Sequence, residues 1–197
     1  MTTSDWDRTE SAFQHEQNRE AAEYDYSAVA RALAIGPDSS VAERTIDITT
    51  LGARSGTPRR AEVWFHRVDG RWYLTGMPVP RSWYANLRAN PRFIVHLKHG
   101  VTADLPATAA PVDEPTRRRV ITAVLVLQNQ PDIAARVSRR QDPDDWLARS
   151  PLVEIVLDDK RLHGVLGAVG IVRTPGSVTA FTGLERHRFG ADAGEVT

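Results

Sequence analysis

The sequence predicts a mixed α+β fold that is mainly β, built as a small closed or split β-barrel with flanking helices. At least six segments have the composition of strands, and several of them show the period-two alternation of apolar and polar residues that is typical of half-buried strands. The connections between most of these segments are short, which favours antiparallel neighbours, because parallel strands need long crossovers. The dipeptide Asp69-Gly70 separates two of the segments and is a strong signal for a two-residue hairpin turn.

The expected strands follow one another between residues 41 and 160. In the first of them, Ile46 and Ile48 alternate with polar residues, and the second is rich in β-branched and aromatic residues. The hairpin at Asp69-Gly70 joins the second strand to the third, and a turn at His99-Gly100 joins the next pair. We expect the six strands at residues 41–49, 60–68, 71–75, 93–97, 101–110 and 152–157.

Helical spacing of apolar residues marks the segments outside the strands. Val29 and Leu33 lie on one face of a helix that ends before Gly36. Ser82 is the expected N-cap of a short helix that ends at Asn90, the residue before a proline. Further helices are expected at residues 113–127, at residues 131–140 and around residue 146.

The chain divides into three parts by these patterns. Residues 1–40 form an N-terminal helical arm, and residues 41–160 form the barrel domain. Residues 161–197 are rich in glycine and lack a strong period, so they are expected to form a C-terminal tail that packs only in part and ends disordered.

The composition excludes several classes of function. Lys plus Arg and Asp plus Glu number 25 each, so no net charge draws the whole protein to nucleic acid or to acidic lipid. The absence of cysteine excludes a disulfide framework, an iron–sulfur cluster and a thiol nucleophile. The sequence shows no signal peptide and no apolar run long enough for a membrane span. We therefore expect a cytoplasmic protein whose anion site, if it has one, is local.

Such a local site is indicated between the first two strands. There, Arg54, Arg59 and Arg60 surround Ser55 and Gly56. Glycine allows a ligand to approach the backbone closely, and guanidinium groups donate paired hydrogen bonds to phosphate or carboxylate. The loop has neither the Walker pattern nor the dinucleotide fingerprint. From composition alone, a solvated turn with surface arginines is an equally good interpretation.

Two motifs give the chain its family resemblance. The first is Gly52-Ala53-Arg54-Ser55-Gly56-Thr57-Pro58-Arg59, and the second is Trp83-Tyr84-Ala85-Asn86-Leu87-Arg88-Ala89-Asn90-Pro91. At this separation, they resemble the deazaflavin (F420)-dependent nitroreductase family. Its members are oxidoreductases with a split β-barrel of the FMN-binding, pyridoxamine-phosphate-oxidase-like (PNPOx-like) kind. The resemblance covers about residues 44–112.

The resemblance implies a cofactor, a reaction and a site. F420 would exchange hydride with a small conjugated, quinone or nitro-type molecule, and the protein would position the two and exclude water. The phosphate and acidic tail of F420 would lie against the basic loop, and its ring near the segment after the hairpin. No catalytic acid or base is required, so none is assigned. The implied cofactor-binding residues are Arg54, Ser55, Gly56, Arg59, Arg60, Gly76, Met77, Pro78, Trp83 and Asn86.

Other interpretations stay open at this point. FMN could replace F420, or the barrel could bind a flavin, haem or lipid without catalysis. A nucleic-acid or protein-interaction module using the arginine clusters on the helices is less favoured, because acidic residues are interspersed with them. No histidine pattern nucleates a metal site, so none is expected. Proteins of this type commonly pair, so a homodimer is a further expectation. Trp64, Trp72 and Trp83 could stack on a planar cofactor or pack in the core.

Overall fold

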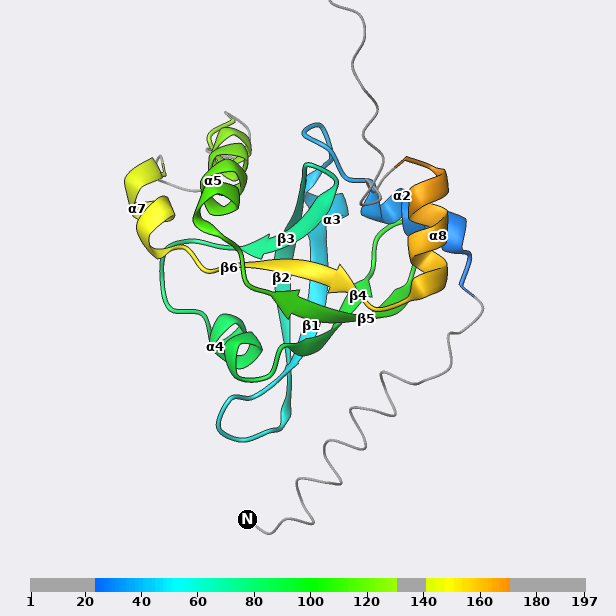
Figure 1. Ribbon diagram of the computed structural model, residues 1–197, viewed down its shortest axis with the longest axis horizontal. Helices are drawn as coiled ribbons and strands as arrows, with labels where there is room; N and C mark the ends of the chain where they lie inside the picture. Colours follow the sequence, from blue (N-terminus) through cyan, green and yellow to red (C-terminus); the bar gives the residue numbers. More distant parts are fainter. Residues whose placement is uncertain (1–23, 131–140, 171–197) are drawn as a thin grey trace, which may run out of the picture.

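Six antiparallel strands close into one barrel in the computed structural model, which describes residues 24–130 and 141–170. Around the barrel, the strand order is β1-β2-β3-β6-β5-β4, and β4 pairs with β1 to complete the circle (Figure 1). The expected mainly-β α+β barrel is therefore confirmed. The strands are β1 (Thr45–Leu51), β2 (Pro58–Val68), β3 (Arg71–Thr75), β4 (Arg92–Leu97), β5 (Ala103–Ala110) and β6 (Leu152–Leu157).

The alternation in each strand decides which side chains fill the barrel. Successive side chains of a strand point to opposite faces, so every second residue turns inward. Phe65, Phe93 and Ile48 are at most 1% exposed and belong to one interior cluster. Burying an aliphatic or aromatic side chain of this size stabilises the fold by about 1.5–3 kcal/mol. The same alternation turns the residues between them to the outer face, where the candidate site lies.

The turn between β2 and β3 confirms the hairpin prediction. Asp69 and Gly70 have φ angles of 53° and 77°. Two successive residues with positive φ form the turn whose twist matches that of the flanking strands. The register Val68↔Arg71 follows directly from this two-residue loop.

Two helices pack together against one end of the barrel (Figure 1). These are α2 (Tyr26–Leu33), as expected from its spacing, and α8 (Lys160–Ala168). The sequence analysis did not predict α8, because glycines interrupt its apolar period. Its Leu162 and Leu166 are nevertheless fully buried, one turn apart. The Tyr26 hydroxyl donates to the Asp159 carboxylate at 2.9 Å, which joins the two helices. The division of the chain into three parts stays a prediction.

A second apolar cluster lies on the outer face of the barrel. The helices α5 (Glu114–Gln128) and α7 (Pro143–Arg149) cover Tyr73 of β3 and Leu152 of β6. Both helices begin at an aspartate N-cap, with Asp113 and Asp142 accepting from backbone amides at 2.9 Å. The expected helix at 131–140 lies outside the described residues. In the part of the chain that the structure describes, no helix has the length and apolarity needed to cross a membrane.

Two local predictions were wrong. The short helix α3 (Val41–Arg44) occupies the start of the expected first strand, because Ser40 and Glu43 form a capping box there. In α4 (Ser82–Ala89), Arg81 rather than Ser82 is the N-cap residue, and its side chain makes no cap hydrogen bond. The Ala85 amide donates to the Arg81 carbonyl, so Ser82 already has helical backbone and cannot act as the cap.

Candidate functional site

The basic loop between β1 and β2 has a fixed backbone. The Gly52 amide donates to the Thr57 carbonyl at 2.9 Å, and the Gly56 amide donates to the Gly52 carbonyl at 2.8 Å. Gly56 has a φ of 63°, a conformation that favours glycine. A Cβ at Gly52 would lie 2.5 Å from the Ser55 Oγ, so a larger residue there would force the Ser55 hydroxyl to move. The Ser55 and Thr57 hydroxyls lie 2.8 Å apart.

Asn86 of α4 holds this loop in place. Its Oδ1 accepts from the Ala53 amide at 2.9 Å, and its Nδ2 donates to the Thr50 hydroxyl at 2.9 Å. The residue is 7% exposed, and Trp83 beside it is equally buried. The second sequence motif therefore positions the first motif. Since both amide atoms of Asn86 are used in this way, it supports the loop instead of forming the floor of a ring site.

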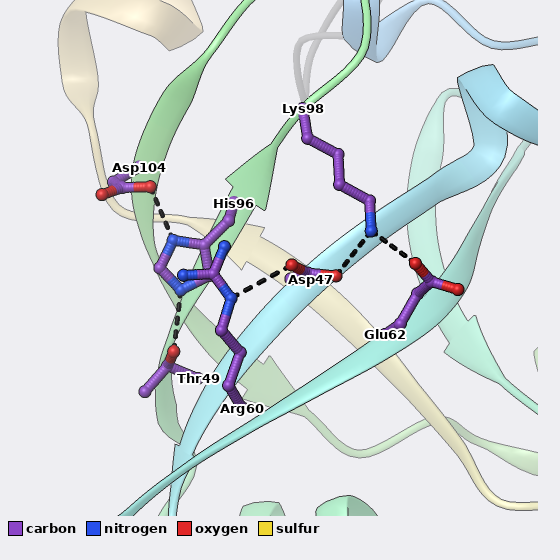
Figure 2. Close-up of polar contacts among 7 residues, drawn as sticks. All are labelled: Asp47, Thr49, Arg60, Glu62, His96, Lys98 and Asp104. Atoms are coloured by element: carbon purple, nitrogen blue, oxygen red, sulfur yellow. Dashed lines mark hydrogen bonds and ion pairs between the residues drawn. The ribbon is translucent and has the colours of Figure 1, made fainter.

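The three arginines of the loop differ in their partners. Figure 2 shows that Arg60 donates to the Asp47 carboxylate, at 3.0 Å. The side chains of Arg54 and Arg59 are exposed, and neither guanidinium group makes a hydrogen bond or ion pair with any described residue. Of the three, Arg54 and Arg59 therefore have guanidinium groups available to an external anion.

Asp47 is the centre of an ion-pair network on the outer face of the barrel. Lys98, the residue directly after β4, donates to Asp47 at 2.7 Å and to Glu62 of β2 at 2.6 Å (Figure 2). Partial burial acts to raise the pKa of Asp47. The hydrogen bonds from Lys98 and Arg60 outweigh it and hold that pKa below its ordinary value. The network joins β1, β2 and β4 and balances the charge of Arg60.

A cleft of about 370 Å³ lies on the same outer face, within the volume range of small-molecule sites. Its floor comes from β2 and β3, and its sides come from the segment after β3, from α4, from α5 and from α7. Three aromatic side chains line it together with several polar ones. The lining residues are Glu62, Val63, Trp64, His66, Thr75, Gly76, Met77, Arg81, Trp83, Gln128, Gln141 and Trp146.

The predicted site residues fall into two groups. Gly76, Met77 and Trp83 line the cleft, whereas Pro78 and Asn86 do not. Of the three tryptophans considered, Trp64 and Trp83 also line it. Trp72 belongs to the barrel interior, where its indole N–H donates to the Leu33 carbonyl at 2.8 Å.

The other group consists of Arg54, Ser55, Gly56, Arg59 and Arg60, which lie at the loop beyond the cleft. Strand β2 connects the two groups. Arg60, Glu62, Trp64 and His66 share its outer face, because they are two residues apart. With a rise of about 3.3 Å per residue, Arg60 lies about 7 Å from the first cleft residue along the strand.

Sequence reasoning missed the polar residues of the cleft, among them Arg81 and His66. The Arg81 side chain is partly buried, and its guanidinium group makes no hydrogen bond or ion pair with the described residues. His66 is 4% exposed, and burial followed by the charge of Arg44 lowers its pKa to about 3. Its position four residues beyond Glu62 and two beyond Trp64 was the available signal for His66.

The other buried histidine has a structural role. His96 lies between Asp104 and Thr49, with its Nδ1 2.6 Å from the Asp104 carboxylate and its Nε2 2.8 Å from the Thr49 hydroxyl (Figure 2). These contacts join β4 to both of its neighbours in the barrel. Among the residues with described positions, no group of three or more histidine or carboxylate side chains could hold a metal ion.

A closed six-stranded barrel with flanking helices, an aromatic cleft and an exposed cationic loop defines a protein of the split-barrel class. The chain belongs to the family of F420H(2)-dependent quinone reductases, whose family model matches residues 28–141. The protein is therefore an oxidoreductase that uses F420. The predicted family, enzyme class and cofactor are confirmed.

Similar solved structures share low sequence identity with the chain. A conserved hypothetical protein, Rv2991 from Mycobacterium tuberculosis, is 20% identical over 75% of this chain and 92% of its own, with a TM-score of 0.46. An F420 reductase is 18% identical over 58% of this chain and 86% of its own, with a TM-score of 0.41. General Stress Protein 26 from Bacillus anthracis is 16% identical over 66% and 89%, with a TM-score of 0.42. No curated protein matches the chain.

Proposed function

We propose that the basic loop grips the anionic end of F420 and that the cleft holds its ring beside a small quinone-type acceptor. In this proposal Arg54 and Arg59 supply the charge, and Ser55 and Gly56 supply polar groups of the loop. The observation that carries the proposal is the placement of two exposed arginines, Arg54 in the loop before β2 and Arg59 at the start of β2, next to the strand whose outer face continues into the cleft. A molecule with an anionic tail and a planar head matches that arrangement.

The chemistry of the lining fits this cofactor. Phosphate and carboxylate groups form strong, paired hydrogen bonds with guanidinium groups. Trp64, Trp83 and Met77 offer apolar surface to a planar ring, and Gly76 lets a ring approach the backbone. Arg60 has a different role in the proposal, because its hydrogen bond to Asp47 fixes the first residues of β2 beside the basic loop. Pro78 shapes the segment that follows Gly76 and Met77.

In the reaction, reduced F420 supplies the hydride. The residues of this chain bind the two reactants, orient them and exclude water from the cleft, which is where a protein contributes most to cofactor chemistry. Conjugated quinones, and nitro compounds of similar shape, are the acceptors expected for a cleft that combines aromatic side chains with polar groups.

Fluorescence titration directly tests whether the basic loop binds the anionic end of F420. The double variant Arg54→Ala/Arg59→Ala is expected to bind oxidised F420 at least about tenfold more weakly, because two charge-assisted contacts are lost. The matched control is Arg31→Ala/Arg118→Ala, which removes two exposed arginines from α2 and α5. Unchanged affinity of the first variant would remove the loop from the site.

Two further measurements test the rest of the proposal. The same titration with FMN distinguishes the two cofactors, and consumption of reduced F420 with menadione distinguishes an enzyme from a binding protein. A wild-type protein that binds F420 without turnover would contradict the proposed reaction but not the grip.

We also propose a cytoplasmic location, because a reductase must meet its cofactor where that cofactor is reduced again. Pairing into a homodimer is a proposal of the same standing, and sedimentation of the purified protein tests it. Neither proposal affects the assignment of the loop and the cleft.

A further inference from the structure

His66 is a buried polar side chain of the cleft without a partner. It is 4% exposed, it lines the cleft, and neither ring nitrogen makes a hydrogen bond with the described residues. Its polar neighbours differ in this respect. The Thr75 hydroxyl donates to the Pro151 carbonyl at 2.7 Å, and the Trp146 indole N–H donates to the Gln141 side chain at 3.0 Å.

A buried polar group without a partner needs an explanation. Most buried polar groups find a partner within the protein, because leaving one unsatisfied is costly. The ring nitrogens of His66 are not among the fully enclosed, unpartnered atoms of the described residues, so they face the cleft and not the packed interior. His96 shows how this chain treats a histidine with a structural role, since both of its ring nitrogens are engaged. His66 lines the cleft, so its ring nitrogens are available for hydrogen bonds to a bound molecule.

The charge state of His66 decides what it can offer. Burial, with a contribution from the positive charge of Arg44, lowers its pKa to about 3, so the ring is neutral near pH 7. A neutral imidazole has one N–H donor and one acceptor nitrogen. The charged groups that share the cleft are Glu62, whose carboxylate is paired with Lys98, and Arg81. No carboxylate is hydrogen-bonded to His66 among the described residues, so none fixes its proton.

We propose that His66 donates a hydrogen bond to the carbonyl oxygen of the acceptor and stabilises that oxygen during reduction; this rests on the proposed function. A quinone that receives hydride, two electrons with one hydrogen, develops negative charge on a carbonyl oxygen. A proton from water then completes the hydroquinone, and His66 keeps its own proton. A preorganised neutral donor in a water-poor site is suited to this task.

The acceptor class follows from this role. A donor at the floor of the cleft favours planar acceptors with a carbonyl oxygen at one edge, as in quinones. An acceptor of the same shape without such an oxygen would leave the imidazole unsatisfied and would react more slowly.

Two substitutions separate hydrogen bonding from packing. His66→Leu removes the donor and keeps most of the volume, whereas His66→Gln keeps an N–H donor. We expect kcat/KM for menadione to fall about tenfold or more in His66→Leu, mainly through kcat, and to recover to within about threefold of wild type in His66→Gln. The affinity for F420 should stay within about twofold in both. His99→Leu, at an exposed histidine outside the cleft, is the matched control and should behave as wild type.

A measurement on the wild-type protein does not depend on either variant folding. Imidazole ¹⁵N resonances distinguish the neutral ring from the charged one, and the spectrum of His66→Gln or, failing that, of His66→Asn identifies the signal of His66. We expect a neutral ring down to about pH 4, and a shift of its N–H resonance when menadione is added to protein loaded with oxidised F420. The chain has no cysteine with which the quinone could react.

The outcomes distinguish this proposal from the one on which it rests. Protein that fails to bind F420 or to reduce any quinone contradicts the proposed function. Active enzyme with an unchanged kcat/KM in His66→Leu, or with a His66 resonance that does not respond to saturating menadione, overturns the role of His66 alone. A loss of activity near pH 6.5 that His66→Gln abolishes would also overturn it, because it would show that the ring acts in its charged form.

Discussion

Asn86 is the residue through which the two sequence motifs act as one site. Its side chain bonds the Ala53 amide and the Thr50 hydroxyl, so α4 fixes the loop that carries Arg54. The motif that contains Asn86 can be recognised in the sequence, but the role of each of its residues cannot. The sequence predicted that Asn86 belongs to the site, whereas its use as a brace for the loop required the three-dimensional contacts.

Replacing Asn86 by alanine tests this role. The change removes the Asn86 partner of the Ala53 amide and of the buried Thr50 hydroxyl, so we expect the free energy of unfolding to fall by about 1–3 kcal/mol. Affinity for F420 should fall as well, because the loop loses its fixed position. Urea unfolding and fluorescence titration measure the two effects. Arg88→Ala, an exposed change on the same helix, is the control, and equal stabilities of the two variants would contradict the assignment.

The sequence alone could not show that residues such as His66 and Arg81 belong to the same site. Both come together with Gln141 and Trp146 only because β2, α4 and α7 meet around one cleft. Because these residues are far apart in the sequence, no local pattern indicates that they lie together. The arginine-rich loop was visible because its functional groups are neighbours in sequence, and a local excess of charge needs no tertiary information.

At the scale of elements, the strands were the most predictable part of the molecule. The last expected strand matches β6 residue for residue, because a period of two is a direct consequence of strand geometry. Helices were less certain. α8 was missed because Gly164 and Gly167 interrupt its pattern, although Leu162 and Leu166 provide enough buried surface to hold it on the barrel.

The network around Asp47 couples three strands, and it predicts how stability depends on pH. Hydrogen bonds from Lys98 and Arg60, opposed by burial, keep the folded pKa of Asp47 below its ordinary value of 3.8. The unfolded chain therefore binds a proton more readily, so the contribution of Asp47 is present above about pH 4 and is lost as the pH falls through the folded pKa.

Asp47→Asn should remove this contribution. We expect the variant to be less stable than wild type near pH 7 and to lose less stability than wild type between about pH 4 and pH 2. Urea midpoints across that range measure the difference. Asp158→Asn provides an exposed control that leaves the network intact. A difference between Asp47→Asn and wild type that stays constant with pH would contradict the prediction.

At the scale of the whole molecule, zero net charge and an open cationic loop are compatible because the other charges are largely paired on the surface. Arg60, Lys98 and Arg71, for example, each lie within an ion pair. An anionic cofactor is therefore attracted by the positive charge of the loop and not by a net positive charge of the whole protein. Binding of the cofactor should stabilise the whole fold, because the loop and the cleft are built from strands and helices across the barrel.

Ligand-linked stability makes that connection measurable. A ligand that binds the folded state alone, at a concentration 100 times its Kd, stabilises it by about 2.7 kcal/mol. For a domain of this size, each kcal/mol raises Tm by about 2–4 °C, so oxidised F420 should raise the Tm of wild type by about 5–10 °C. In Arg54→Ala/Arg59→Ala, a tenfold weaker Kd reduces the stabilisation at the same concentration to about 1.4 kcal/mol, roughly half the shift. Differential scanning fluorimetry measures both shifts. A full shift in the double variant would mean that the anion is held elsewhere, and no shift in wild type would mean that the fold does not bind this cofactor.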